Sequence, residues 1–121
     1  TSEMEEVVSS CKDIAECAVV GIEDQLKGQI PFAVAVTKAG VTKDEKVIEK
    51  EVVTLVRDKI GAVACLKNVM IVNRLPKTRS GKILRKLIRT MLDGKDFQIP
   101  STIDDEAIVG EIQEKIKTYS F

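Results

Sequence analysis

The sequence predicts an α+β fold, a small mixed sheet with helices packed on it, in the order helix, strand, strand, helix, strand, helix, helix (αββαβαα). Two observations support this class. Short valine-rich segments alternate along the chain with longer segments whose apolar residues recur every three or four positions. The length of 121 residues also suits one domain with one core.

Four helices are predicted, two of them from capping boxes. The capping pairs are Ser2 with Glu5 and Thr42 with Glu45. Apolar residues at helical spacing follow each pair, so we expect helices over residues 2–11 and 43–60. An apolar stripe predicts a third helix from near Ser80 to near Gly94, and isoleucines four residues apart predict a fourth, ending at about residue 118.

Three strands are predicted from short apolar segments. Residues 16–22 and 31–37 are rich in valine and separated by a loop that contains glycine, which indicates an antiparallel pair. Residues 68–75 have the same character and end at a proline, so we expect a third strand there.

The composition limits the chemistry available to the chain. Hydrophobic residues make up 44% and charged residues 31%, which is typical of a soluble globular domain and leaves no membrane span. The absence of histidine excludes histidine acid–base catalysis and ordinary zinc sites, and we expect no metal site. Cys11, Cys17 and Cys65 lack a metal-ligand spacing, so reduced core thiols are expected. The acidic first residues are unlike a signal or transit peptide and suggest a start inside a longer chain.

Positive charge is concentrated between the third strand and the third helix, although the chain has 19 basic and 19 acidic residues. The basic residues are Arg74, Lys77, Arg79, Lys82, Arg85, Lys86 and Arg89. A lysine at position 82 would lie in or just before the first helical turn, where free backbone N–H groups attract anions. Thr78 and Ser80 add hydroxyl groups, and Gly81 lets a ligand approach the backbone. These features predict a phosphate or carboxylate ligand, against the alternative of a merely solvated basic face.

Two more specific interpretations are disfavoured. A nucleotide-binding P-loop needs glycine and a hydroxyl residue where this chain has Pro76 and Ile83. Nucleic-acid binding lacks support because the basic segment has no aromatic residue for base stacking and the formal net charge is zero.

Several segments together resemble the C-terminal domain of the short-chain acyl-CoA synthetases, of the acetyl- and propionyl-CoA synthetase type, in the adenylate-forming superfamily. They are "LPKTRSGKILRK", "IAECAVVGIEDQLKGQIPFAVAV", "VRDKIGAVACLKNVMIVNRLPKTRSGKILRKLIRTMLDGK" and "STIDDEAIVGEI". The resemblance implies that residues 1–121 form the mobile C-terminal lid domain of such an enzyme. The large N-terminal domain of the family has no counterpart in the sequence.

The resemblance also implies roles for individual residues. Lys82 corresponds to the catalytic lysine that contacts the carboxylate and ATP during adenylation, and Arg57 to an arginine that binds the 3′-phosphate of coenzyme A. The neighbours expected to contact substrate or nucleotide are Thr78, Arg79, Ser80 and Gly81. The alternative for Arg57 is an ordinary helix arginine paired with an acid one turn away.

The family further implies substrates, partners and regulation. The substrates would be a short-chain carboxylic acid, ATP and coenzyme A, with Mg²⁺ bound by the absent N-terminal domain, and the isolated chain would be inactive. Family members are acylated at the lysine corresponding to Lys82 and restored by deacylases, so a lysine acetyltransferase and a deacylase are possible partners. Neither nucleic acid nor membrane is expected, and the location would be the cytoplasm or the mitochondrial matrix. Two rival functions are a stand-alone basic module for RNA or anionic lipid and a purely structural accessory domain.

Overall fold

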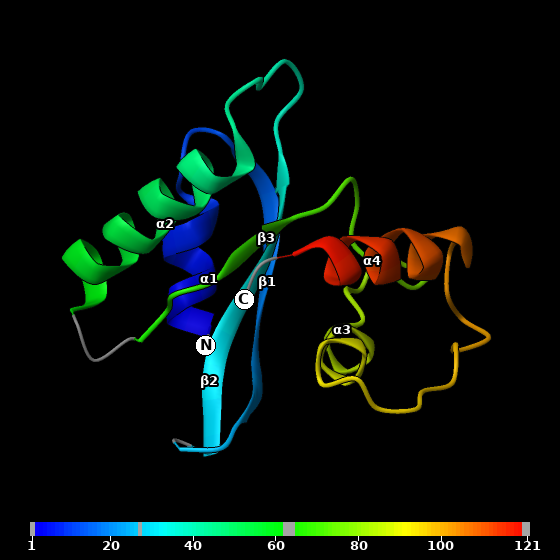
Figure 1. The fold of residues 1–121 in the computed structure, drawn as a ribbon. Coiled ribbons are helices and arrows are strands. Elements are labelled where there is room, and N and C mark those ends of the chain that lie inside the picture. Colours follow the sequence, from blue (N-terminus) through cyan, green and yellow to red (C-terminus); the bar gives the residue numbers. More distant parts are fainter. Residues whose placement is uncertain (1, 27, 62–64, 120–121) are drawn as a thin grey trace.

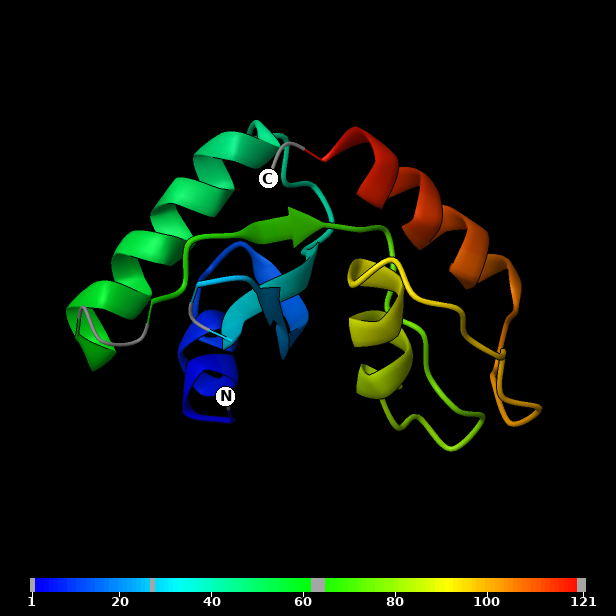
Figure 2. The same cartoon turned by 60° about the horizontal axis from the view of Figure 1, so that its bottom comes forward.

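A computed structural model describes residues 2–26, 28–61 and 65–119 of the chain. A three-stranded sheet lies between two layers of helices, with α1 and α2 on one side and α3 and α4 on the other (Figures 1 and 2). The elements are α1 (Ser2–Ser9), β1 (Ile14–Asp24), β2 (Gly28–Thr37), α2 (Glu45–Ile60), β3 (Val69–Ile71), α3 (Arg85–Leu92) and α4 (Ala107–Thr118). The predicted class and element order are confirmed.

The sheet is mixed, with β2 at its centre. β1 and β2 pair antiparallel, with Val19 opposite Ala33, whereas β2 and β3 pair parallel, with Ala33 opposite Val69. The strand order β1-β2-β3 makes β1 an edge strand. The third strand is much shorter than the predicted residues 68–75, because the chain leaves the sheet after Ile71 to approach the basic segment.

Side-chain alternation along the strands creates two cores, one on each face of the sheet. Cys17 and Val19 point toward α1 and α2, and Ala18 and Val20 point toward α3 and α4. The face covered by α3 and α4 includes Phe32, Val34, Met70, Leu75, Ile88, Ile103 and Ile112. The segment from the third strand to α4 is therefore held against one face of the sheet. In the described part of the chain no helix has the length and apolar character needed to cross a membrane.

The first predicted capping box does not form. The carboxylate of Glu5 turns away from its own helix and accepts a hydrogen bond from the backbone N–H of Val19 at 2.9 Å. It also forms a two-point contact with the guanidinium of Arg85, with N···O distances of 2.6 and 2.9 Å. Glu5 thus links α1, β1 and α3, and α1 ends at Ser9 instead of residue 11.

The second predicted capping residue is also wrong, because the helix is capped two residues later than expected. The residue that caps α2 is Asp44, whose carboxylate accepts the backbone N–H of Lys46 at 2.8 Å, and not Thr42. An Asp in this position satisfies one of the donors that the first helical turn leaves without a partner. The helix itself, Glu45–Ile60, agrees with the predicted 43–60.

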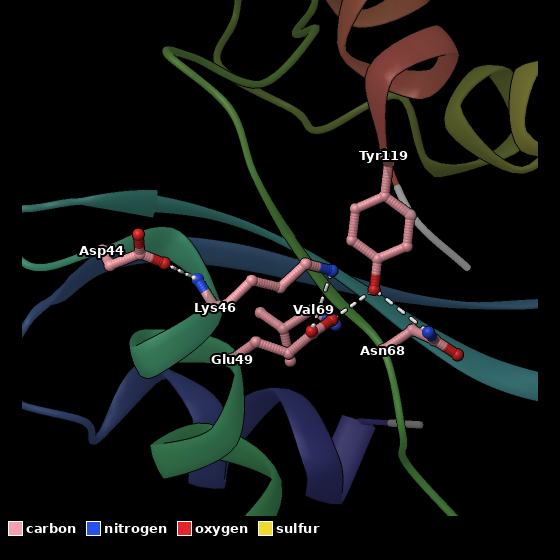
Figure 3. A network of polar contacts seen from close by, with 6 residues as sticks. All are labelled: Asp44, Lys46, Glu49, Asn68, Val69 and Tyr119. Carbon is pink, nitrogen blue, oxygen red and sulfur yellow. Dashed lines mark hydrogen bonds and ion pairs between the residues drawn. The ribbon is translucent and has the colours of Figure 1, made fainter.

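The end of α4 is fastened to the opposite helix layer by a polar cluster (Figure 3). The Tyr119 hydroxyl donates to the carboxylate of Glu49 and accepts from Nδ2 of Asn68 at 3.0 Å. The same carboxylate accepts the backbone N–H of Val69 at 2.7 Å. The Tyr119 ring meets Phe32 edge-on, with centroids 5.4 Å apart. This cluster joins α4, β3 and α2 at one point.

The cysteines differ in their surroundings. All three are reduced thiols, as predicted. Cys17 is buried in the core, Cys11 is partly buried and packs against it, and Cys65 is only partly buried. Burial raises the pKa of the Cys11 and Cys17 thiols, which favours their protonated form at neutral pH.

Candidate functional site

The basic segment forms a closed turn. Lys77 and Ile83 face each other in an antiparallel bridge. Inside it, the N–H of Thr78 donates to the carbonyl of Lys82 at 2.8 Å, and the N–H of Gly81 donates to the carbonyl of Thr78 at 2.9 Å. Gly81 has φ +92°, a left-handed conformation that glycine adopts without strain. This arrangement is typical of a hairpin with a three-residue loop that ends in glycine.

The turn is also fixed from outside by two distant parts of the chain. On one side, the N–H of Arg79 donates to the carbonyl of Thr102 at 3.1 Å, and the N–H of Asp104 donates to the carbonyl of Lys77 at 2.8 Å. On the other side, Nζ of Lys77 pairs with Glu16 of β1 at 2.7 Å. The position of the turn is thus set by both β1 and the segment before α4.

The hydroxyl groups of the turn bond within the turn itself. Oγ1 of Thr78 accepts the backbone N–H of Lys82 at 3.1 Å and lies 2.9 Å from Oγ of Ser80. They therefore stabilise the loop, and their role as ligand-binding groups stays a prediction.

The predicted helix start near Ser80 is wrong, and Lys82 lies before the helix instead of in its first turn. Helix α3 begins at Arg85, three residues later, and its first turn has no side-chain cap. Ile83 is held in the bridge, and the N–H of Leu84 donates back to the carbonyl of Pro76 at 2.9 Å, which keeps both residues out of the helix. The apolar stripe misled the prediction because Ile83 and Leu84 pack against the core from an extended segment.

Ion pairs neutralise three of the seven basic residues. Arg74 pairs with Asp105 at 2.8 Å and with Glu111 at 2.7 Å. The other two pairs are Lys77 with Glu16 and Arg85 with Glu5. These cations hold the turn and the helices in place, and the basic surface is therefore smaller than the sequence suggests.

The other four cations have no side-chain partner in the part of the chain that the structure describes; they are Arg79, Lys82, Lys86 and Arg89. Lys82 and Arg79 are exposed on the closed turn. An exposed ammonium group on a well-anchored turn is available to an anionic ligand at little cost in ordering the backbone.

Arg57 lies far from the turn, on the last turn of α2. Its side chain is exposed and forms no ion pair with any described residue, so the predicted alternative of pairing with an acid one turn away is not observed. Helix α2 covers one face of the sheet, whereas the turn leads into α3 on the other face (Figures 1 and 2). The structure keeps the two predicted sites apart.

The chain is also similar in sequence to known proteins. A sequence model described as the AMP-binding enzyme C-terminal domain matches residues 3–82. The chain is 45% identical over 114 residues to mouse acyl-CoA synthetase short-chain family member 3, mitochondrial, which covers 94% of this chain and 17% of the mouse protein. It is 40% identical over 119 residues to acetyl-coenzyme A synthetase 1 of Debaryomyces hansenii, covering 97% and 18% of the two chains.

A solved structure supports the fold. Acetoacetyl-CoA synthetase from Streptomyces lividans superposes with a TM-score of 0.78 at 20% identity, over 98% of this chain and 18% of that one. The chain thus spans less than a fifth of the length of the curated relatives it matches.

Proposed function

Because the chain belongs to the AMP-binding enzyme C-terminal domain family, we propose that it is the mobile C-terminal domain of an ATP-dependent short-chain acyl-CoA synthetase. Lys82 would be the lysine of the adenylation step. The observation that carries this assignment is the exposed Lys82 ammonium group, which has no partner in the described residues and stands on a turn anchored at both sides. The relatives do not support the alternative of an RNA- or lipid-binding module.

The proposed reaction has two steps. First, a carboxylate oxygen of the acid attacks the α-phosphorus of ATP, the bond to pyrophosphate breaks, and an acyl-adenylate forms. Then the thiol of coenzyme A attacks the acyl carbon, loses its proton, and AMP leaves as acyl-CoA forms. In the first step two anions must approach each other, and a lysine ammonium between them offsets their repulsion and stabilises the charge that they share.

Arg57 would serve the second step by binding the 3′-phosphate of coenzyme A. An arginine suits this role because its guanidinium donates several hydrogen bonds to phosphate oxygens. Since Arg57 lies on α2 and Lys82 on the turn that leads into α3, on the other face of the sheet, one orientation of the domain would present Lys82 and another Arg57. Thr78, Arg79, Ser80 and Gly81 would line the nucleotide side of the turn.

The described part of the chain offers no site for the Mg²⁺ that accompanies ATP. The described residues contain no group of three His, Cys, Asp or Glu side chains placed to hold a metal ion. We therefore propose that the N-terminal domain binds Mg²⁺, and we assign no part of the reaction to a metal ion held by this chain.

Regulation and location follow the same assignment. Acetylation of Lys82 by a lysine acetyltransferase would remove the charge that adenylation needs, and a deacylase would restore it. We propose the cytoplasm or the mitochondrial matrix as the location; the mouse relative is described as mitochondrial.

The test uses the full-length synthetase and separates the two half-reactions. Lys82→Ala should lower acyl-adenylate formation from acid and ATP by several orders of magnitude, but leave thioester formation from supplied acyl-adenylate and coenzyme A largely intact. Lys50→Ala is the matched control, because Lys50 is also exposed and has no partner within the described residues. Equal loss of both half-reactions in Lys82→Ala, or an unchanged rate of adenylation, would contradict the proposal.

A further inference from the structure

Carboxylates accept backbone hydrogen bonds at two places along the outer edge of β1. The backbone N–H of Val19 donates to Glu5, and the backbone N–H of Glu23 donates to Oδ1 of Asp93, each at 2.9 Å. Both N–H groups point away from β2, as alternate residues of an edge strand do. Acidic side chains therefore supply acceptors that a fourth strand would otherwise provide.

Helix α3 runs alongside this edge. Its first residue, Arg85, pairs with Glu5 beside Val19, and Asp93, just after its last residue, bonds to Glu23. Eight helical steps rise about 12 Å, and four strand residues span about 13 Å, so the two segments match in length. The middle of α3 consequently faces the middle of this stretch of β1.

The residue at that midpoint is Gly21, whose backbone N–H has no acceptor in the described part of the chain. It lies two residues from Val19 and two from Glu23, so its N–H also points outward, away from its neighbour Pro31 in β2. A cleft opens here between strand and helix. Its lining residues are Val19, Val20, Gly21, Arg85, Lys86 and Arg89.

The charges around the cleft favour an anion. Lys86 and Arg89 are one helical turn apart and exposed, and neither has an ion-pair partner among the described residues. The acidic groups nearby are engaged, because Glu5 pairs with Arg85 and Glu23 pairs with Lys95. The opposing charges that remain are Asp93, at the Glu23 end of the helix, and Asp96, which lines a neighbouring cavity together with Lys86.

We propose that this cleft binds a phosphate group, with the Gly21 N–H, Lys86 and Arg89 as its donors. One fixed backbone donor, a mobile ammonium and a guanidinium fork offer more donors than a carboxylate can use, and a phosphate monoester has three terminal oxygens to accept them. Gly21 has no side chain, and the carboxamide of Gln29 lies against the place that one would take, with Oε1 2.9 Å from the ideal Cβ position. The site does not include the turn around Lys82 and does not depend on the proposed catalytic function.

The test follows the Gly21 amide of the ¹⁵N-labelled 121-residue chain by NMR. Sodium phosphate is titrated at about pH 7.5, where phosphate is mainly dianionic, at constant ionic strength. AMP is titrated in parallel, with adenosine and acetate as controls. We expect saturable shifts of the Gly21 resonance with phosphate and AMP. A stronger response to AMP would identify a nucleotide as the source of the phosphate.

Matched charge variants complete the experiment. Lys86→Gln combined with Arg89→Gln should weaken phosphate binding about ten-fold, because two charge-assisted donors are lost. Lys12→Gln combined with Lys50→Gln removes the same charge from exposed residues elsewhere and should leave binding unchanged. Equal weakening in both pairs, no response at Gly21, or an equal response to acetate or adenosine would overturn the proposal.

Discussion

The Tyr119 hydroxyl donates a hydrogen bond to the Glu49 carboxylate and so connects the end of α4 with α2, which lies on the other side of the sheet (Figure 3). Tyr119→Phe would keep the edge-on contact with Phe32 and remove the hydroxyl alone. We expect the free energy of unfolding to fall by about 2 kcal/mol, the usual net value of a hydrogen bond to a charged group. Urea unfolding would measure this, and an unchanged midpoint would show that the bond adds nothing.

The same tyrosine predicts a loss of stability at high pH. Burial and the hydrogen bond to Glu49 raise the pKa of Tyr119 well above its usual value. Because the folded pKa is the higher one, the contribution is complete below the unfolded pKa of about 10 and is lost as the pH rises further. The stability difference between the natural chain and Tyr119→Phe should therefore shrink above about pH 10. A constant difference up to pH 11.5 would contradict this assignment.

Glu5 predicts the opposite pH dependence. Burial alone would raise the pKa of this carboxyl, but hydrogen bonds from Arg85 and from the N–H of Val19 outweigh it and hold the pKa below its usual value. The stabilisation is present above the unfolded pKa of about 4.3 and disappears as the pH falls through the lower folded pKa.

Replacing Glu5 by Gln should therefore cost about 2 kcal/mol at pH 7, because a charge-assisted pair is lost and the Val19 N–H keeps a weaker acceptor. The difference from the natural chain should diminish below about pH 4. Glu3→Gln serves as the control, since Glu3 is an exposed acid of the same helix. A similar change in both variants would show that the contact with Arg85 contributes little.

Gly81→Ala tests the conformation of the turn. A methyl group at this position would meet no atom within 4 Å, so any effect comes from the backbone, whose φ of +92° is strained for alanine. We expect a loss of about 1–2 kcal/mol in unfolding free energy. Gly110→Ala is the control, because Gly110 lies in α4 with equally open space and an ordinary helical backbone. A smaller loss in Gly81→Ala than in Gly110→Ala would contradict the turn geometry.

Acetylation confined to Lys82 should silence adenylation in the full-length synthetase, because it removes the positive charge and two of the three donors. Acetylation at Lys50 should have little effect, since this exposed lysine lies on α2, away from the turn. Mass spectrometry of a partially acetylated sample would follow occupancy at each site against activity. Loss of activity that tracks Lys50 in place of Lys82 would refute the assignment.

The sequence predicted the elements better than their long-range partners. Valine-rich segments are confirmed as β1 and β2, because alternate side chains of these strands fill both cores. Nothing local indicated that Glu5 would bond to Arg85, 80 positions away, in place of capping its own helix. A capping pattern considers only the residues of one helix. It fails when a tertiary contact uses the carboxylate that would otherwise cap that helix.

The candidate site was predicted in composition but not in geometry. Residues 78–82 were selected as candidate site residues, but the sequence placed the start of a helix near Ser80 where the structure has a closed turn. The backbone bonds that fix this turn to Thr102 and Asp104 are not revealed by any spacing rule. The sequence also did not reveal which basic residues form ion pairs. The partners of Arg74 lie far along the chain, Asp105 in the segment before α4 and Glu111 in α4. The lysine at position 82 was identified by resemblance, and its role remains a proposal.

The hydrogen bonds between the turn and residues 102–104 matter for enzyme engineering. The family match ends at residue 82. If domains were exchanged between synthetases at that point, the turn would come from one parent and residues 102–104, which hold it in place, from the other. Lys77, Arg79 and their backbone partners would then come from sequences that never evolved together. A chimera that takes the chain as far as Tyr119 from one parent keeps the turn, residues 102–104 and the Tyr119 cluster together. It should therefore preserve the position of Lys82.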